Sequence, residues 1–141
     1  LMISPSMWRR YVKPAYRKVF DVCTAGGVKV YLHSDGYVVD IMRDLHEIGV
    51  DILNIQDLCN GPENIRRELK GELCIDLDVD RQRILPRGTP EEVKDHVRRC
   101  ARVLGSPRGG LMMICGIYPP TPLRNIEALF EAMSGLRAGP G

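Results

Sequence analysis

The chain has 141 residues, 44% of them apolar, and a net charge of +2 at pH 7, which fits one soluble domain, residues 1–141. No apolar run approaches the ~20 residues of a membrane-spanning helix and no signal peptide is recognisable, so we expect no membrane association. Arginine pairs lie beside acids in helical patterns, which argues against a nucleic-acid partner. Five cysteines without a C-x-x-C pair are typical of free thiols in a reducing cytoplasm.

The first predicted element is a long amphipathic helix. Ser4 is a capping residue with Pro5 in the first turn, and apolar residues then recur at helical spacing from Trp8 to Cys23. Pro14 lies inside this stripe and predicts a kink. Gly26-Gly27 ends the helix.

Four strands alternating with helices are predicted for the rest of the chain. The predicted strands are Val28–Leu32, Val50–Ile55, Leu73–Asp78 and Leu111–Ile114. The predicted helices are Val39–Ile48, Pro62–Leu69, Pro90 to about Leu104 after a Thr89 capping box, and one from Thr121-Pro122 to about Leu136. This alternation indicates right-handed crossovers and a parallel sheet.

Four such units fit either a small open sheet or half of an eight-unit barrel, whose full length is typically ~250 residues. There is no G-x-G-x-x-G and no P-loop, so a nucleotide-binding open sheet has no support.

Alternation of side chains along the strands assigns residues to faces. On the first and third strands, the side away from the helices is expected to carry Lys29, Tyr31, His33 and Asp35, and Cys74, Asp76 and Asp78. On the second strand one face is shared by Ile52, Asn54 and Gln56, and on the fourth by Met113 and Cys115. Polar residues then collect at the carboxyl ends of all four strands. Such a collection favours the mouth of a barrel over an open sheet.

His33-Ser34-Asp35-Gly36 is the most informative motif. His33 and Asp35 point the same way at a strand end, and with Cys115 at another strand end they offer imidazole, carboxylate and thiolate ligands for a metal. Three alternatives stay open. His33 can be a hydrogen-bonded strand-end histidine, Asp35 a turn residue before Gly36, and Cys115 a small buried apolar residue.

Further residues are candidates for binding a substrate. These are Asn54, Gln56, Asp78 and Tyr118, the last in a proline-stiffened loop over the site. The two amides can instead satisfy backbone groups inside a barrel, and Asp57, Asp76 and Asp78 can be pocket acids or helix caps. The remaining polar candidates, His46 and His96, lie on charged helix faces and are expected to be solvated. Cys23, Cys74 and Cys100 are expected to be packing residues.

Several segments resemble a known family in their order and spacing. They are Ser4–Met7, Gly27–Val30 before His33–Gly36, Gly49–Asn54, Ile84–Val93, Cys115–Ile117 and Thr121–Ile126. Together they resemble the carboxyl-terminal half of the uroporphyrinogen decarboxylase superfamily, which also contains cobalamin-dependent methyltransferases that act on thiols such as coenzyme M. The resemblance covers nearly the whole chain. It implies an α/β fold, a TIM-barrel segment of about four parallel strand-helix units.

Within that superfamily the chain is nearer the methyltransferase branch. Those enzymes carry a zinc-binding His-x-Cys after one strand and a second cysteine after a later strand. His33 and Cys115 match two of these positions, and Asp35 stands where the first cysteine would be. The resemblance thus implies zinc held by His33, Asp35 and Cys115, a methylcobalamin or corrinoid donor, a small thiol or a tetrapyrrole or corrinoid as substrate, and a corrinoid protein as partner.

Two other functions remain alternatives. One is decarboxylation of uroporphyrinogen, although the decarboxylases have a histidine where Cys115 stands. The other is a non-catalytic fragment that binds a corrinoid or tetrapyrrole. No catalytic residue is assigned. A half barrel also has two open sheet edges, so we expect a homo-oligomer that associates through Leu111–Ile114, and an isolated chain without turnover.

Overall fold

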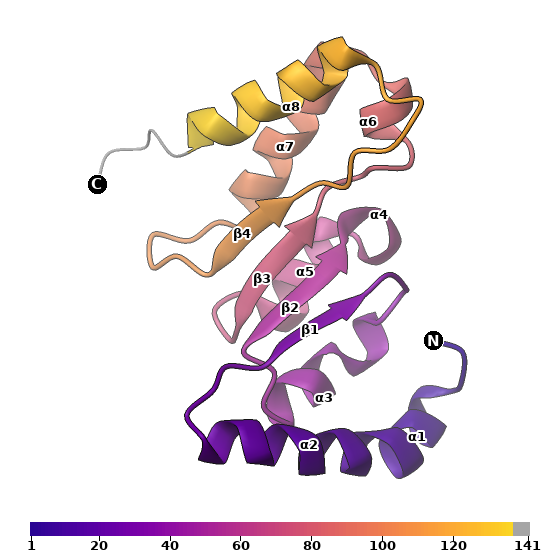
Figure 1. The fold of residues 1–141 in the computed structure, drawn as a ribbon, viewed down its shortest axis with the longest axis vertical. Helices are drawn as coiled ribbons and strands as arrows, with labels where there is room; N and C mark the ends of the chain where they lie inside the picture. The colour runs from indigo at the N-terminus through magenta and orange to yellow at the C-terminus, as the bar shows by residue number, and fades with distance from the viewer. Residues whose placement is uncertain (137–141) are drawn as a thin grey trace.

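The computed structural model describes residues 1–136, which form a parallel four-stranded sheet flanked by helices (Figure 1). The strands are β1 (Tyr31–Ser34), β2 (Ile52–Gln56), β3 (Cys74–Asp78) and β4 (Leu111–Ile114). They pair in the order β1-β2-β3-β4, and all three pairings are parallel. The predicted partial barrel with open edges at its first and fourth strands is confirmed.

The helices alternate with these strands. They are α1 (Pro5–Met7), α2 (Lys13–Ala25), α3 (Met42–Glu47), α4 (Asp57–Asn60), α5 (Pro62–Leu69), α6 (Ile84–Arg87), α7 (Pro90–Leu104) and α8 (Leu123–Gly135). In Figure 1, α1 to α3 lie at the β1 end of the sheet, α5 lies behind the sheet, and α6 to α8 lie at the β4 end. The described part of the chain has no helix with the length and apolar character needed to span a bilayer.

The first predicted helix is interrupted by one turn of π-helix, Trp8–Val12, between α1 and α2. Pro14 is the physical cause, because it has no amide hydrogen and its ring would clash with the carbonyl four residues earlier. The chain widens instead, and Lys13 donates its amide to the carbonyl of Trp8, five residues back.

The apolar stripe of this helix is only partly covered, and Cys23 packs against the core as expected. Only Trp8 is buried. Charged contacts hold the helix on α3, because Arg9 Nε and Lys13 Nζ lie 2.9 and 2.7 Å from the carboxylate oxygens of the buried Asp44. Val12, Phe20 and Cys23 of the stripe are partly buried and pack against the main apolar core.

Other elements also differ from the predictions. The first strand, β1, begins at Tyr31, three residues after the predicted start at Val28, because the Val30 amide bonds to the Asp51 carboxylate. The predicted helix at Val39 begins as a 3-10 turn, Val39–Ile41. The short helices α4 and α6 were not predicted.

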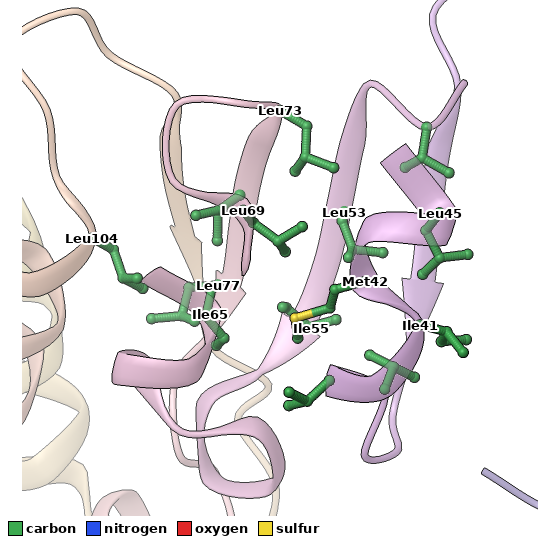
Figure 2. Close-up of a cluster of buried hydrophobic side chains, with 14 of the residues drawn as sticks. Ile41, Met42, Leu45, Leu53, Ile55, Ile65, Leu69, Leu73, Leu77 and Leu104 are labelled. Carbon is green, nitrogen blue, oxygen red and sulfur yellow. The ribbon is translucent and has the colours of Figure 1, made fainter. Parts of the chain in front are cut away.

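The main core lies between the sheet and the helices behind it. Leu53 and Ile55 of β2 contact side chains of α3 and α5, among them Met42 and Ile65, and all four are fully buried (Figure 2). Each such side chain contributes roughly 1.5–3 kcal/mol to folding. Ile75 and Leu77 of β3 belong to the same core, as the alternation predicts.

A second apolar cluster holds α8 against α7. Its buried members are Val79, Leu85, Val93, Val97, Ala128, Leu129 and Ala132. The predicted capping box opens α7, because Thr89 accepts a hydrogen bond from the Glu92 amide and Glu92 accepts one from the Thr89 amide.

The opposite face of the sheet is polar on three strands and apolar on the fourth. His33, Asn54, Asp76 and Met112 are paired across the four strands. On β4 this face carries Met112 and Ile114, both exposed. Met113 and Cys115 do share a face, but it is the helix side, where both pack against the second apolar cluster. The expectation of polar side chains at all four strand ends is therefore wrong for β4.

Candidate functional site

The orientation of His33 is fixed by a neighbouring amide. Asn54 donates its Nδ2 hydrogen to the carbonyl of Asp76 at 2.8 Å, which leaves its Oδ1 atom as an acceptor. That oxygen lies 2.5 Å from His33 Nδ1, so this ring nitrogen carries a proton. The other ring nitrogen, Nε2, is free to bind a cation or a second proton. A metal-ligating histidine needs this same arrangement.

Asp35 faces that nitrogen, with its Oδ2 atom 3.3 Å from His33 Nε2. Its Oδ1 atom accepts hydrogen bonds from Gln56 Nε2 and from Arg81, each at 2.7 Å. The interaction with His33 lowers the pKa of Asp35, and those with Arg81 and Gln56 lower it further. His33 and Asp35 therefore offer a ring nitrogen and a carboxylate oxygen side by side, which a cation could bind together.

Arg81 joins this pair to a buried acid. One guanidinium nitrogen bonds Asp35, and another lies 2.5 Å from Oδ2 of Asp78, whose side chain is 1% exposed. Burial raises the pKa of Asp78, and the charge of Arg81 opposes that rise. The guanidinium also lies 5.8 Å from the centre of the Tyr118 ring. We name this group, His33, Asp35, Asn54, Gln56, Asp78 and Arg81, the strand-end site.

Arg81 was not predicted as a site residue from the sequence. It follows β3 in a loop that has no periodicity, and its role depends on an Asp35 that is 46 residues away in the chain. The available signal was a basic residue three positions after the strand-end acid Asp78. The four residues predicted to bind substrate do gather here, because Asn54, Gln56 and Asp78 belong to the site and Tyr118 lies beside Arg81.

Cys115 lies apart from the other two predicted metal ligands. Its thiol is directed to the carbonyl of Val79 at 3.4 Å, on the helix side of the sheet. Burial raises its pKa to about 12, so it is a neutral thiol at pH 7. The described residues contain one group of three ligand atoms within 4.8 Å of one another, and it does not include His33, Asp35 and Cys115.

Of the three predicted zinc ligands, His33 and Asp35 are therefore placed to bind one ion, and Cys115 is not. His33 Nε2 and Asp35 Oδ2 are a nitrogen and an oxygen of the kinds that zinc takes, and they face each other. For Cys115 to join them, the segment after β4 has to turn its sulfur to the other side of the sheet.

Asp76 is held by a tyrosine. Tyr31 donates its hydroxyl to Asp76 Oδ2 at 2.6 Å across the interior face. This hydrogen bond, with a smaller contribution from burial, raises the pKa of Tyr31 to about 12. Asp76 is 4% exposed, and its carbonyl accepts the Nδ2 hydrogen of Asn54 in the strand-end site.

The expectation that His96 is solvated is wrong. Its side chain is 22% exposed, and its Nε2 atom lies 2.5 Å from Oδ2 of Asp57, which is buried at the start of α4. The sequence pattern gave no sign of this contact, because Asp57 belongs to a short helix that was not predicted.

Comparison with known proteins identifies relatives along the whole described chain. The family model "Uroporphyrinogen decarboxylase (URO-D)" matches residues 1–136. Uroporphyrinogen decarboxylases from two strains of Thermus thermophilus are 28% identical over 138 residues. "Methylcobamide:CoM methyltransferase MtbA" from Methanosarcina mazei is 24% identical over 139 residues. Each alignment covers 96% of this chain and 39% of the relative.

A solved structure supports the fold. A methyltransferase from Methanosarcina mazei superimposes with a TM-score of 0.71 at 22% identity, over 96% of this chain and 39% of that one. The chain spans about two fifths of the length of the proteins that it matches.

Proposed function

The chain belongs to the uroporphyrinogen decarboxylase family, and from that premise we propose that the full-length protein is a cobalamin-dependent methyltransferase that methylates a small thiol. The activity belongs to a longer protein, because the relatives have more than twice this length. The observation that carries the proposal is the His33–Asp35 pair, whose ring nitrogen and carboxylate face each other at 3.3 Å. The methyltransferase relative adds support.

In this proposal His33 and Asp35 hold zinc, and Cys115 becomes the third ligand when the segment after β4 turns its sulfur to their side of the sheet. Zinc supplies an open coordination position at which the pKa of a substrate thiol falls, so that its thiolate form predominates at neutral pH. Asn54 keeps the proton on His33 Nδ1, and Gln56 and Arg81 hold the Asp35 carboxylate in place. Tyr118, beside Arg81, covers the substrate. The methyl donor is methylcobalamin or a corrinoid protein.

The proposed setting is a reducing cytoplasm. All five cysteines are free thiols in the structure, which supports such a setting.

The test uses the full-length protein with methylcobalamin and 2-mercaptoethanesulfonate or other small thiols, and follows demethylation of the cobalamin by absorbance. We expect His33→Ala to lower both the zinc content and the rate by more than about 100-fold, since loss of a ligand costs more than loss of its hydrogen-bond partner. His46→Ala, an exposed histidine of α3, is the matched control and should leave both unchanged. Wild-type protein without zinc and without methyl transfer would overturn the proposal.

Asp35→Cys restores the ligand expected for this branch. We expect tighter zinc binding and faster thiol methylation, because a thiolate places more charge on the metal than a carboxylate does. A slower enzyme with unchanged zinc affinity would mean that Asp35 acts in another way, for example by holding Arg81.

A second candidate is uroporphyrinogen decarboxylation. Two observations favour it: the identity to the decarboxylases is 28%, and Arg81 places a guanidinium at the strand-end site, where it can pair with a substrate carboxylate. The same protein preparation separates the two functions. Release of carbon dioxide from uroporphyrinogen, together with no turnover of methylcobalamin, would establish the second.

A further inference from the structure

Three metal-ligating side chains meet in a second place, between α4 and α7. Asp57 is the first residue of α4, and His96 and Cys100 are one turn apart on α7. Asp57 and Cys100 are 2% and 0% exposed, and the His96 side chain reaches the surface at 22% exposure. Their ligand atoms all lie within 4.8 Å of one another, the one group of this kind among residues 1–136.

The distances within this group are close to those of a tetrahedral zinc site. Bonds of about 2.0–2.3 Å at tetrahedral angles place a sulfur about 3.6 Å from a nitrogen or an oxygen ligand. The Cys100 sulfur lies 3.6 Å from Asp57 Oδ2 and 3.7 Å from His96 Nε2. The third separation, 2.5 Å between His96 Nε2 and Asp57 Oδ2, is a hydrogen bond, and it has to open by less than about 1 Å to admit the ion.

A second observation independently points to a missing ligand. Oδ1 of Asp57 is fully buried and has no hydrogen-bond partner among the described residues. A buried carboxylate oxygen without a partner is destabilising, and the few that occur in proteins often mark an ion or a water. An ion pair between Asp57 and His96 accounts for Oδ2 alone.

We propose that Asp57, His96 and Cys100 bind one zinc ion, with a water as fourth ligand on the exposed side of His96. Nitrogen, sulfur and oxygen donors in one small group favour zinc over magnesium or calcium, which take oxygen ligands. The ion ties the start of α4 to the middle of α7. This site does not depend on the proposed methyl transfer and shares no residue with the strand-end site.

The experiment uses full-length protein in which His33→Ala and Asp35→Ala remove the strand-end donors. Metal is stripped with a chelator, and Co²⁺ is added as a spectroscopic probe for zinc. We expect about one ion per chain bound at this site, with a thiolate-to-cobalt charge-transfer band, because a cysteine ligand is present. Zn²⁺ should displace the Co²⁺ and abolish the band.

Three single variants identify the ligands, and two test specificity. Cys100→Ser should remove the charge-transfer band, and Asp57→Asn and His96→Gln should weaken Co²⁺ affinity by more than about 100-fold. Cys23→Ser and His46→Gln change the same residue types elsewhere and should bind Co²⁺ like the parent. His96→Gln alters a partly exposed side chain, so it keeps the test meaningful if the two buried variants misfold.

The proposal is overturned if the parent protein binds no Co²⁺, or if the band persists in Cys100→Ser. Neither result bears on methyl transfer, which has its own assay with the His33 donor intact.

Discussion

At the scale of single residues, Asn54 decides which nitrogen of His33 carries the proton. The amide can be oriented in only one way, because its Nδ2 hydrogen is committed to the carbonyl of Asp76. Its oxygen must then accept from His33 Nδ1. The lone pair of Nε2 faces Asp35 as a consequence.

We therefore expect the neutral ring of His33 to be protonated at Nδ1, and Asn54→Leu to shift that proton toward Nε2. Nitrogen chemical shifts of the His33 ring measure this directly. The variant should also lose about 10- to 100-fold in zinc affinity, the usual cost of removing a partner of a ligating histidine. Asn64→Leu, on α5, is the matched control. A ring protonated at Nε2 in the unchanged protein would contradict the argument.

Tyr31 gives a prediction about pH. Its pKa is raised to about 12 by the hydrogen bond to Asp76, so the folded protein binds this proton more tightly than the unfolded chain does. The resulting stabilisation is complete below pH 10 and disappears as pH rises toward 12. An ultraviolet titration should show one tyrosine that ionises near pH 12, and Tyr31→Phe should remove that step.

Asp76→Asn is the complementary variant, because it removes the charge and keeps the shape. The late step should then move to lower pH. If it stays near pH 12, another tyrosine is responsible.

At the scale of elements, one amide fastens α8 to α6 and to the turn that follows α6. Asn125 is fully buried, and its Nδ2 atom donates to the carbonyls of Leu85 and Gly88, each at 2.8 Å. Asn125→Ala leaves both carbonyls without that donor. We expect a loss of about 2–3 kcal/mol in the free energy of unfolding, measured by urea denaturation.

Arg124→Ala is the matched control, on the exposed side of the same helix. It should change the free energy of unfolding by less than about 0.5 kcal/mol. An Asn125→Ala variant as stable as this control would mean that the two carbonyls find water in its place.

The elements that could be predicted from sequence are those whose signal is local. Periodicity and the Thr89 capping box specify α7, and the alternation of apolar and acidic residues specifies β3. The face of β4 could not be predicted, because Leu111–Ile114 is apolar throughout and carries no alternation. Its face is decided by the pairing of Leu111 with Ile75, a tertiary contact. The same pairing decides the side of the sheet on which Cys115 lies, and for this reason its sulfur lies away from His33 and Asp35.

At the scale of the whole molecule, the open sheet edges and the interior face predict association. Tyr31, Met112 and Ile114 expose apolar surface on the interior face, and β1 and β4 end the described sheet. A groove of about 900 Å³ also runs along β4 beside Phe130 of α8. We expect the isolated chain to form a dimer or larger species, visible by light scattering at micromolar concentration.

Two charged variants locate the contact. Met112→Lys with Ile114→Lys should return the chain to a 15.9 kDa monomer, because charges on this face resist burial. Val22→Lys adds the same charge on an exposed position of α2 and should leave the association intact. A stable monomer of the unchanged chain would exclude self-association through β4.

The order of the strands has a consequence for how the chain folds. Each strand pairs with the next one along the sequence, so Tyr31 meets Ile52, Ile52 meets Cys74, and Ile75 meets Leu111. The connection to β4 is the longest, but a loop of less than twice the length adds less than about 0.6 kcal/mol of closure entropy. Within the described sheet, each strand therefore pairs with the strand nearest to it in sequence, and we expect this order to favour faster folding than pairing between strands farther apart in the chain.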